Sequence, residues 1–287
     1  MDTKDVERNL GSCTEEDRTL FQSIVGSLMY LANATHLDIS YAVTRLAQFA
    51  SNIGEKHLVA IKRGLRYIKG TLDAKLQIAT TATDSVSLLI GYFDSSWLDN
   101  PTDRCSTYGI VILQNSLLIL WKSKKHSMVT MSTCESEYLA GTELIRDLCW
   151  IRNILIGLNF PPALPVTVFG DNENANGIAS NGVQHRTQHI EARHFCITEK
   201  VREGLIMVQY LPTEHMIPDM FTKTLPQDTI KRHSRSLGLS FRLPRTLAPF
   251  AICLSSQTIP YTNICVRNMV IIRELTSKKS TYTYTYT

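Results

Sequence analysis

Four acidic side chains lie at positions from which they could bind divalent cations together. Asp94 ends one apolar stretch and Asp171 directly follows another, whereas Glu137 and Asp219 lie in the first turns of two predicted helices. In α/β sheets, side chains at the carboxyl ends of strands leave the packed layer while the backbone still holds them. Helix N-termini favour anionic groups by about 0.3–1 kcal/mol, which alone could account for Glu137 and Asp219.

Helical periodicity places Glu137 on the apolar face of its helix. Stepping back seven residues from Leu144 in the apolar stripe reaches Glu137, whereas Glu135 is predicted to face solvent. Carboxylates that converge in a buried place repel each other unless a cation joins them. Oxygen ligands without cysteine suit Mg²⁺ or Mn²⁺. Two such ions, about 3.5–4 Å apart, can bind the attacking water and the leaving oxygen of a phosphodiester. A metal-dependent nuclease is therefore one interpretation, and scattered surface acids are the other.

The hydropathy pattern divides the chain into parts. Apolar residues recur at three- and four-residue spacing over residues 14–78, so we expect residues 1–80 to form a small helical segment. Residues 81–228 alternate in the order β-β-β-α-β-α-α-β-α, which predicts a mixed α/β domain. Its predicted strands cover residues 86–94, 108–114, 116–123, 166–170 and 205–211. Its long helix is predicted from Ser132 to about Leu158, its last helix from about His215.

Composition excludes several classes of protein. The 287 residues are 44% hydrophobic and 20% charged, as in ordinary globular proteins. No apolar run approaches the roughly 18–20 residues of a membrane helix, so we expect no membrane partner. The charged N-terminus has no signal-peptide pattern, which favours an intracellular, reducing location. The seven cysteines are scattered without a CxxC pair, so neither a disulfide framework nor a zinc ribbon is indicated.

The positive charge is concentrated near the C-terminus. The chain has a formal net charge of +4, but residues 240–287 hold six Lys and Arg against Glu274 alone. The basic balance is therefore weak evidence that the rest of the chain binds nucleic acid. The chain ends in the repeat TYTYTYT, which has no apolar period. We predict that residues 229–287 form an irregular tail.

Basic residues outside this tail offer candidate contacts to nucleic acid. Lys122, Lys124 and Lys125 follow a predicted strand and could track phosphates, although a solvated strand end is the simpler alternative. A second basic group, at three-residue spacing on one helical face, could lie along a template backbone. It consists of Arg63, Arg66 and Lys69.

Five sequence blocks, in this order, resemble the RNase H domain of copia-type LTR-retrotransposon Pol polyproteins. They are GYFDSSWLDNPTDRCSTYG, LWKSKKHSMVTMSTCESEYLAGTE, VFGDNENANGIA, HRTQHIEARHFCITEKVREG and MVQYLPTEHMIPDMFTKTLP. Upstream, FQSIVGSLMYLANATHLDISYAVTRLAQFASN and HLVAIKRGLRYIKGT resemble the end of the reverse transcriptase, at its thumb and connection. The resemblance covers roughly residues 20–226.

This resemblance implies an α/β fold of RNase H type, with a five-stranded mixed sheet flanked by helices. It implies hydrolysis of RNA in RNA–DNA hybrids by two Mg²⁺ or Mn²⁺ ions, with the remaining reverse transcriptase segments as partners. The family's metal ligands fall on Asp94, Glu137, Asp171 and Asp219. Arg186 and His189 are expected to face nucleic acid. A cytoplasmic particle and the nucleus remain equal expectations for its location.

The sequence departs from the family pattern at two places near the acids. Ser96 replaces an aspartate that the family often has, and Pro218 replaces an alanine before Asp219. Two alternatives therefore stay open beside the ribonuclease. One is a non-catalytic, nucleic-acid-binding remnant of a truncated Pol polyprotein. The other is an integrase of related fold, whose last acid is usually glutamate and which these blocks match less well.

Overall fold

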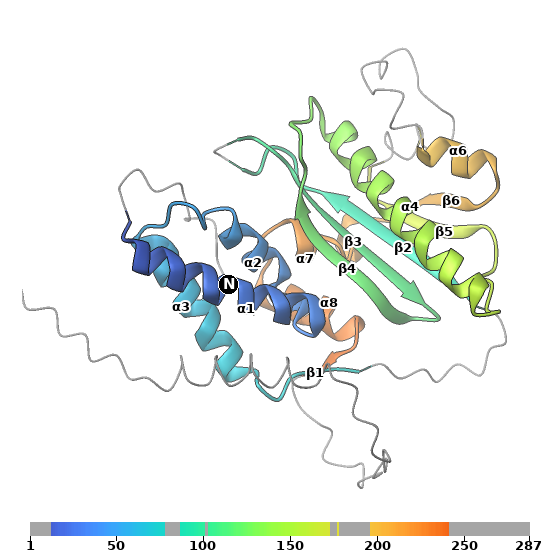
Figure 1. Cartoon of the computed structure of the whole chain (residues 1–287). Coiled ribbons are helices and arrows are strands. Elements are labelled where there is room, and N and C mark those ends of the chain that lie inside the picture. The colour runs from blue at the N-terminus through green and yellow to red at the C-terminus, as the bar shows by residue number, and fades with distance from the viewer. Residues whose placement is uncertain (1–12, 78–86, 101–102, 173–176, 178–195, 241–287) are drawn as a thin grey trace, which may run out of the picture.

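The computed structural model describes residues 13–77, 87–100, 103–172, 177 and 196–240. Its centre is a five-stranded mixed sheet in the order β4-β3-β2-β5-β6 (Figure 1). The strands are β2 (Leu89–Ser95), β3 (Thr107–Gln114), β4 (Leu117–Lys125), β5 (Val166–Gly170) and β6 (Ile206–Tyr210). β2, β3 and β4 pair antiparallel, whereas β5 is parallel to both β2 and β6. The predicted strands and the predicted fold class are confirmed.

Helices cover both faces of this sheet (Figure 1). On one face lie α4 (Thr133–Gly157) and α6 (Cys196–Arg202), whose apolar residues form one core with β2, β3, β5 and β6. On the other lie α2 (Ser40–Ala47), α7 (Asp219–Thr222) and α8 (Gln227–Ser236). A sheet with both faces covered holds residues at its strand ends in fixed positions. No helix in the described part of the chain is long and apolar enough to cross a membrane.

The N-terminal segment is helical, as predicted, and packs against the sheet. It contains α1 (Glu15–Ala34), the short 3₁₀ helix η1 (Leu37–Ile39), α2 and α3 (Glu55–Gly70), which share an apolar core. The Trp121 ring N–H on β4 donates to the Ala32 carbonyl over 2.8 Å. The Thr44 hydroxyl donates to the Ser123 carbonyl over 3.0 Å. The helical segment therefore supports the sheet directly.

The prediction of an irregular tail from residue 229 is wrong for residues 229–240. They complete α8 and form β7 (Leu239–Ser240), which pairs antiparallel with β1 (Lys75–Leu76). Leu237 and Leu239 are buried in the core that also contains Leu37. Ile230, Leu237 and Leu239 are too few to show a period, so only their distant partners reveal why this segment is ordered. Residues 241–287 lie outside the described part.

Two local predictions also need correction. The helix expected from His215 is a 3₁₀ turn, η4 (Thr213–His215), and α7 begins only at Asp219. Pro218 precedes Asp219 and has no N–H to donate, so a helix cannot run through it from His215 without losing a hydrogen bond. Glu135 does not face solvent but is 9% exposed, because its carboxylate accepts the Met131 N–H over 2.7 Å.

A close approach at Gly109 brings α7 to the end of β2. Gly109 lies opposite Asp94 in the ladder between β2 and β3. A Cβ atom added at Gly109 would lie 2.8 Å from Phe221 Cβ and 2.8 Å from the Pro218 carbonyl oxygen. Only glycine leaves room for this contact without moving the backbone, and the contact places Asp219 beside Asp94.

The substitution Gly109→Ala should lower the free energy of unfolding by about 1–3 kcal/mol, because α7 must move away from β3. Urea denaturation would measure this change. Gly26→Ala is the control: this exposed position in α1 has no atom within 4 Å of an added Cβ. It should raise stability by about 0.5–1 kcal/mol. An unchanged or increased stability of the Gly109 variant would contradict the close contact.

Candidate metal centre

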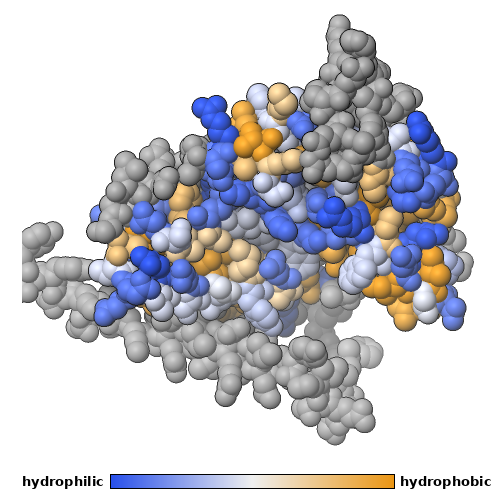
Figure 2. Space-filling view, turned by 45° about the horizontal axis from the view of Figure 1, so that its top comes forward, coloured by the Kyte–Doolittle hydropathy of each residue, from blue (hydrophilic) through white to orange (hydrophobic). Residues whose placement is uncertain are grey.

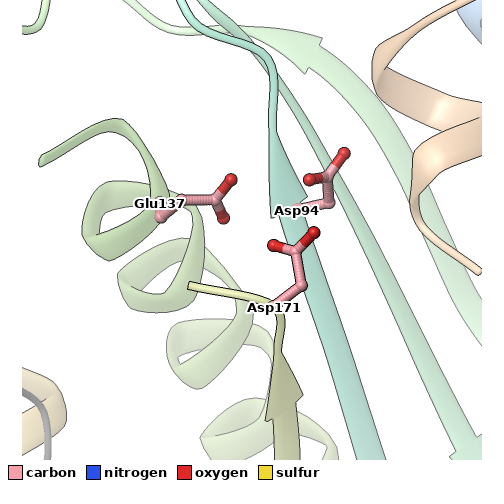
Figure 3. A group of neighbouring side chains, drawn as sticks. All are labelled: Asp94, Glu137 and Asp171. Carbon is pink, nitrogen blue, oxygen red and sulfur yellow. The ribbon is translucent and has the colours of Figure 1, made fainter. Parts of the chain in front are cut away.

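Three carboxylates meet at one edge of the sheet. One carboxylate oxygen from each of Asp94, Glu137 and Asp171 lies within 4.8 Å of the others (Figure 3). Asp94 is on β2, Glu137 is in the first turns of α4 and Asp171 follows β5. β2 and β5 are parallel, with Tyr92 paired to Phe169, so the two aspartates each follow the paired residues by two positions. This register brings them to the same edge.

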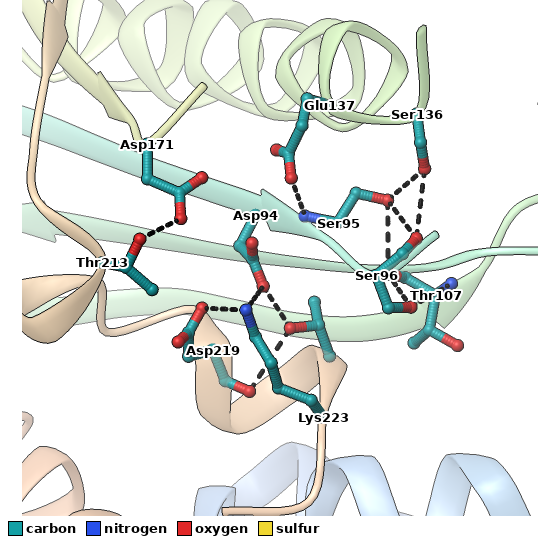
Figure 4. A network of polar contacts seen from close by, with 11 residues as sticks. Asp94, Ser95, Ser96, Thr107, Ser136, Glu137, Asp171, Thr213, Asp219 and Lys223 are labelled. Atoms are coloured by element: carbon teal, nitrogen blue, oxygen red, sulfur yellow. Dashed lines mark hydrogen bonds and ion pairs between the residues drawn. The ribbon is translucent and has the colours of Figure 1, made fainter. Parts of the chain in front are cut away.

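The protein orients Glu137 through its backbone. The Ser95 N–H donates to Glu137 Oε1 over 3.1 Å, whereas Glu137 Oε2 is buried and has no hydrogen-bond partner among the described residues. The hydroxyls of Ser95 and Ser136 contact each other, and Ser136 also donates to the Ser96 carbonyl (Figure 4). These contacts join the start of α4 to the end of β2. They leave the buried Glu137 Oε2 without a hydrogen bond from the described part of the chain.

Asp219 joins the centre from the opposite face of the sheet. Lys223 Nζ lies 2.8 Å from Asp219 Oδ1 and 3.6 Å from Asp94 Oδ2 (Figure 4). The Thr222 hydroxyl donates to the Asp94 carboxylate. Asp219 is not one of the three acids within mutual reach, but Lys223 links it to Asp94. Thus α7 supplies an acid and a hydroxyl to this site, and Lys223, which directly follows α7, supplies an ammonium group.

Thr222 and Lys223 were not among the residues expected at the site. A signal for Lys223 exists, because it follows Asp219 by four residues, the spacing at which oppositely charged helical side chains pair. Only the structure shows that the same ammonium also reaches Asp94. Thr213 is a further addition, since its hydroxyl donates to Asp171 Oδ2 over 2.9 Å.

Burial raises the pKa of every acid in the centre. It raises the pKa of Asp94 to about 6, although the nearby Lys223 charge acts in the opposite direction. Burial, and then the charge of Asp94, raises the pKa of Glu137 well above its usual value. Burial likewise raises the pKa values of Asp171 and Asp219. One lysine thus compensates only part of the charge of four carboxylates, which is the environment a divalent cation stabilises.

Basic residues predicted to contact nucleic acid differ in their availability. Lys122 Nζ lies 2.7 Å from Asp147, and Lys125 Nζ lies 2.5 Å from Asp103, so both charges are already paired. Lys124 is exposed and has no ion pair within the described ranges. Arg186 and His189 lie outside those ranges. When the top of Figure 1 is turned toward the viewer, hydrophilic side chains gather across the middle of the molecule (Figure 2).

The strand order and the helices on both faces define an RNase H-like α/β domain. Among solved structures, the chain is similar to LC11-RNase H1 in complex with an RNA/DNA hybrid. The similarity has a TM-score of 0.36 and 15% identity, and covers 45% of this chain and 88% of that one. At this score the similarity is weak, and the assignment rests on the order and direction of the strands.

Sequence comparison identifies the family. The chain is 34% identical over 229 residues to the retrovirus-related Pol polyprotein from transposon RE1 of Arabidopsis thaliana, which covers 79% of the chain. It is also 32% identical to the retrovirus-related Pol polyprotein from transposon TNT 1-94 of Nicotiana tabacum. This match extends over 220 residues, or 76% of the chain. No protein-family model matches. The chain belongs to the retrovirus-related Pol polyproteins of copia-type transposons, as its sequence blocks predicted, and spans about 15% of the length of these relatives.

Without divalent cations, stability should fall as pH rises through about 6. The folded chain binds a proton at Asp94 more tightly than the unfolded chain, in which the pKa of an aspartate is about 3.9. The stabilisation that comes from protonated Asp94 is therefore complete below about pH 4. It is lost as pH rises through about 6, the pKa of Asp94 in the folded chain. Thermal melting in EDTA at several pH values would measure this decline.

The Asp94→Asn variant is the control for that experiment. The melting temperature of this variant in EDTA should decline less than that of the wild type between pH 4 and about 7. At pH 7 in EDTA, the variant should melt at a higher temperature than the wild type. Added Mn²⁺ should stabilise the wild type, by about 2.7 kcal/mol at 100 times its Kd, and stabilise the variant less. Parallel pH profiles for the two proteins would contradict this account.

Proposed function

We propose that the chain is a metal-dependent endoribonuclease that hydrolyses the RNA strand of RNA–DNA hybrids. The observation that carries the proposal is the convergence of Asp94, Glu137 and Asp171 within 4.8 Å from three separate elements. Membership of the copia-type family supports it. The relatives are much longer, so we also propose that the remaining reverse transcriptase segments are partners of this chain.

The donor set fits two Mg²⁺ or Mn²⁺ ions. All ligand atoms are hard carboxylate oxygens, and Glu137 Oε2 is buried without a hydrogen-bond partner among the described residues. Asp94, Glu137 and Asp171 would hold one ion, and Asp94 and Asp219 the other. When bound, the ions would generate the attacking hydroxide and stabilise the leaving oxygen.

The chain's own side chains orient these ligands. The Ser95 N–H holds one oxygen of Glu137, the Thr222 hydroxyl holds Asp94 and the Thr213 hydroxyl holds Asp171. Hydrogen bonds of this kind fix the direction of a ligand before the metal arrives. Lys223 reduces the repulsion between Asp94 and Asp219, and would have to move when an ion binds between them.

Lys124, Arg186 and His189 are the proposed contacts to the hybrid, with Lys122 and Lys125 available only if their ion pairs open. Lysine and arginine contacts to phosphate release counterions, so binding of the hybrid should weaken as salt increases.

The second candidate function is binding of nucleic acid without hydrolysis. It is favoured by the position of Lys223, whose ammonium group already occupies the space between Asp94 and Asp219. If that group cannot be displaced, the centre holds at most one ion. The chain would then bind a hybrid but leave it intact.

The substitution Glu137→Gln should reduce cleavage of a labelled RNA–DNA hybrid by more than about 100-fold, because it removes a direct ligand. Gel analysis of the RNA strand with Mg²⁺ and with Mn²⁺ would measure this. Glu143→Gln on the same helix is the matched control, since Glu143 pairs with Arg146 at the surface, and should leave cleavage unchanged. Intact hybrid after incubation with folded wild-type chain and either metal would refute hydrolysis in favour of the second candidate.

The substitution Lys223→Gln should tighten Mn²⁺ binding by about three- to tenfold, because it removes a positive charge beside Asp94 and Asp219. Isothermal titration calorimetry would measure the affinity and the number of ions bound. Lys200→Gln is the control, because Lys200 pairs with Glu203 on α6, away from the centre. Equal affinities for the Lys223 variant and the wild type would show that this lysine does not compete with the ions.

A further inference from the structure

A groove between α3 and α8 lies outside the candidate metal centre. It consists of two adjoining cavities of about 760 Å³ and about 340 Å³, and both are lined by Tyr67, Gln227 and Lys231. None of the lining residues belongs to the metal centre. In Figure 1, α3, α8 and β1 lie together in the lower part of the molecule. The groove thus joins the N-terminal helical segment to the C-terminal helix.

Both walls of this groove are basic. The helix α3 carries five Lys and Arg residues against Glu55, and α8 carries three against Asp228. Lys231 and Arg235 line the larger cavity. Arg63 and Arg66 line neither cavity. They are exposed on α3, one helical turn before the lining residues Tyr67 and Gly70, from where their long side chains could reach a strand lying in the groove. Within the described residues, none of these four cations forms an ion pair with an acid.

The smaller cavity adds apolar and unsatisfied polar groups. Ile39, Leu225 and Ile230 line it beside Tyr67. The Tyr67 hydroxyl donates to the carboxylate of Asp38, which also lines this cavity. Ser234 also lines it, and its fully buried hydroxyl has no hydrogen-bond partner in the part of the chain that is described. A ligand in this cavity would contact the apolar side chains and Tyr67, so the cavity is suited to a flat ligand.

We propose that this groove binds a single strand of nucleic acid. Its phosphates would lie between the cations of α3 and α8, and one base would enter the smaller cavity against Tyr67. An unpaired strand combines a row of negative charges with flat bases that stack on aromatic rings and carry donors and acceptors on their edges. A duplex keeps its bases stacked inside, so it could use only the phosphate contacts.

Two double variants test the groove from its two walls. Lys231→Gln with Arg235→Gln removes cations from α8, and Arg63→Gln with Arg66→Gln removes cations from α3. Arg146→Gln with Arg202→Gln is the matched control, because both residues are exposed and lie on α4 and α6. Fluorescence anisotropy with a labelled oligodeoxythymidylate of about 20 nucleotides, and with an RNA–DNA hybrid of equal length, gives the affinities. EDTA in the buffer separates this binding from hydrolysis, so either proposal can fail alone.

Each groove variant should weaken binding of the single strand by roughly tenfold at about 0.1 M salt. It should also reduce the slope of log K against log salt by about 1.4, the value for two phosphate contacts. The control should match the wild type, and the hybrid should be affected less than the single strand. Single-strand binding equal to the control in both groove variants would overturn the proposal. So would equal losses for the single strand and the hybrid.

Discussion

Repulsion between buried carboxylates is the constraint on which this structure depends. Asp94 and Glu137 are 1% and 5% exposed, and the charge of Asp94 raises the pKa values of both Glu137 and Asp171. Such a cluster persists only because other contacts fix the elements that carry it, and because cations reduce its charge. Lys223 supplies one positive charge from within the chain. The remaining excess of negative charge is what would attract the divalent ions that we propose for this edge of the sheet.

The elements that hold the acids come from the whole length of the described chain. The face of the sheet opposite α4 is covered by residues as distant as Leu37 and Leu239, which share one apolar core. Gly109 lets α7 approach the sheet on that face, and α7 brings Asp219 to Asp94. The helical segment and the residues after Phe221 are therefore parts of the support of the centre, not separate appendages.

The segment after α7 also relates the two proposed sites. Lys223 contacts the acids, and the next two residues, Thr224 and Leu225, line the smaller cavity of the groove. A strand bound in the groove and ions bound at the acids would thus contact neighbouring residues of one short segment. If Lys223 moves when metal binds, the neighbouring residues Thr224 and Leu225 in the wall of the groove would also shift.

Local sequence was sufficient for the strands, for α4 and for the positions of the acids at element ends, because periodicity and end signals depend on neighbouring residues. The register of β2 and β5, which sets Asp94 beside Asp171, depends on contacts between distant segments. Contacts between distant segments also determine the ordered structure of residues 229–240 and the groove beside Tyr67. They likewise place Lys223 beside both Asp94 and Asp219. The sequence by itself thus determined the types of group available and the elements that carry them. Tertiary packing alone decided which groups share a site, since burial and charge depend on everything that surrounds a side chain.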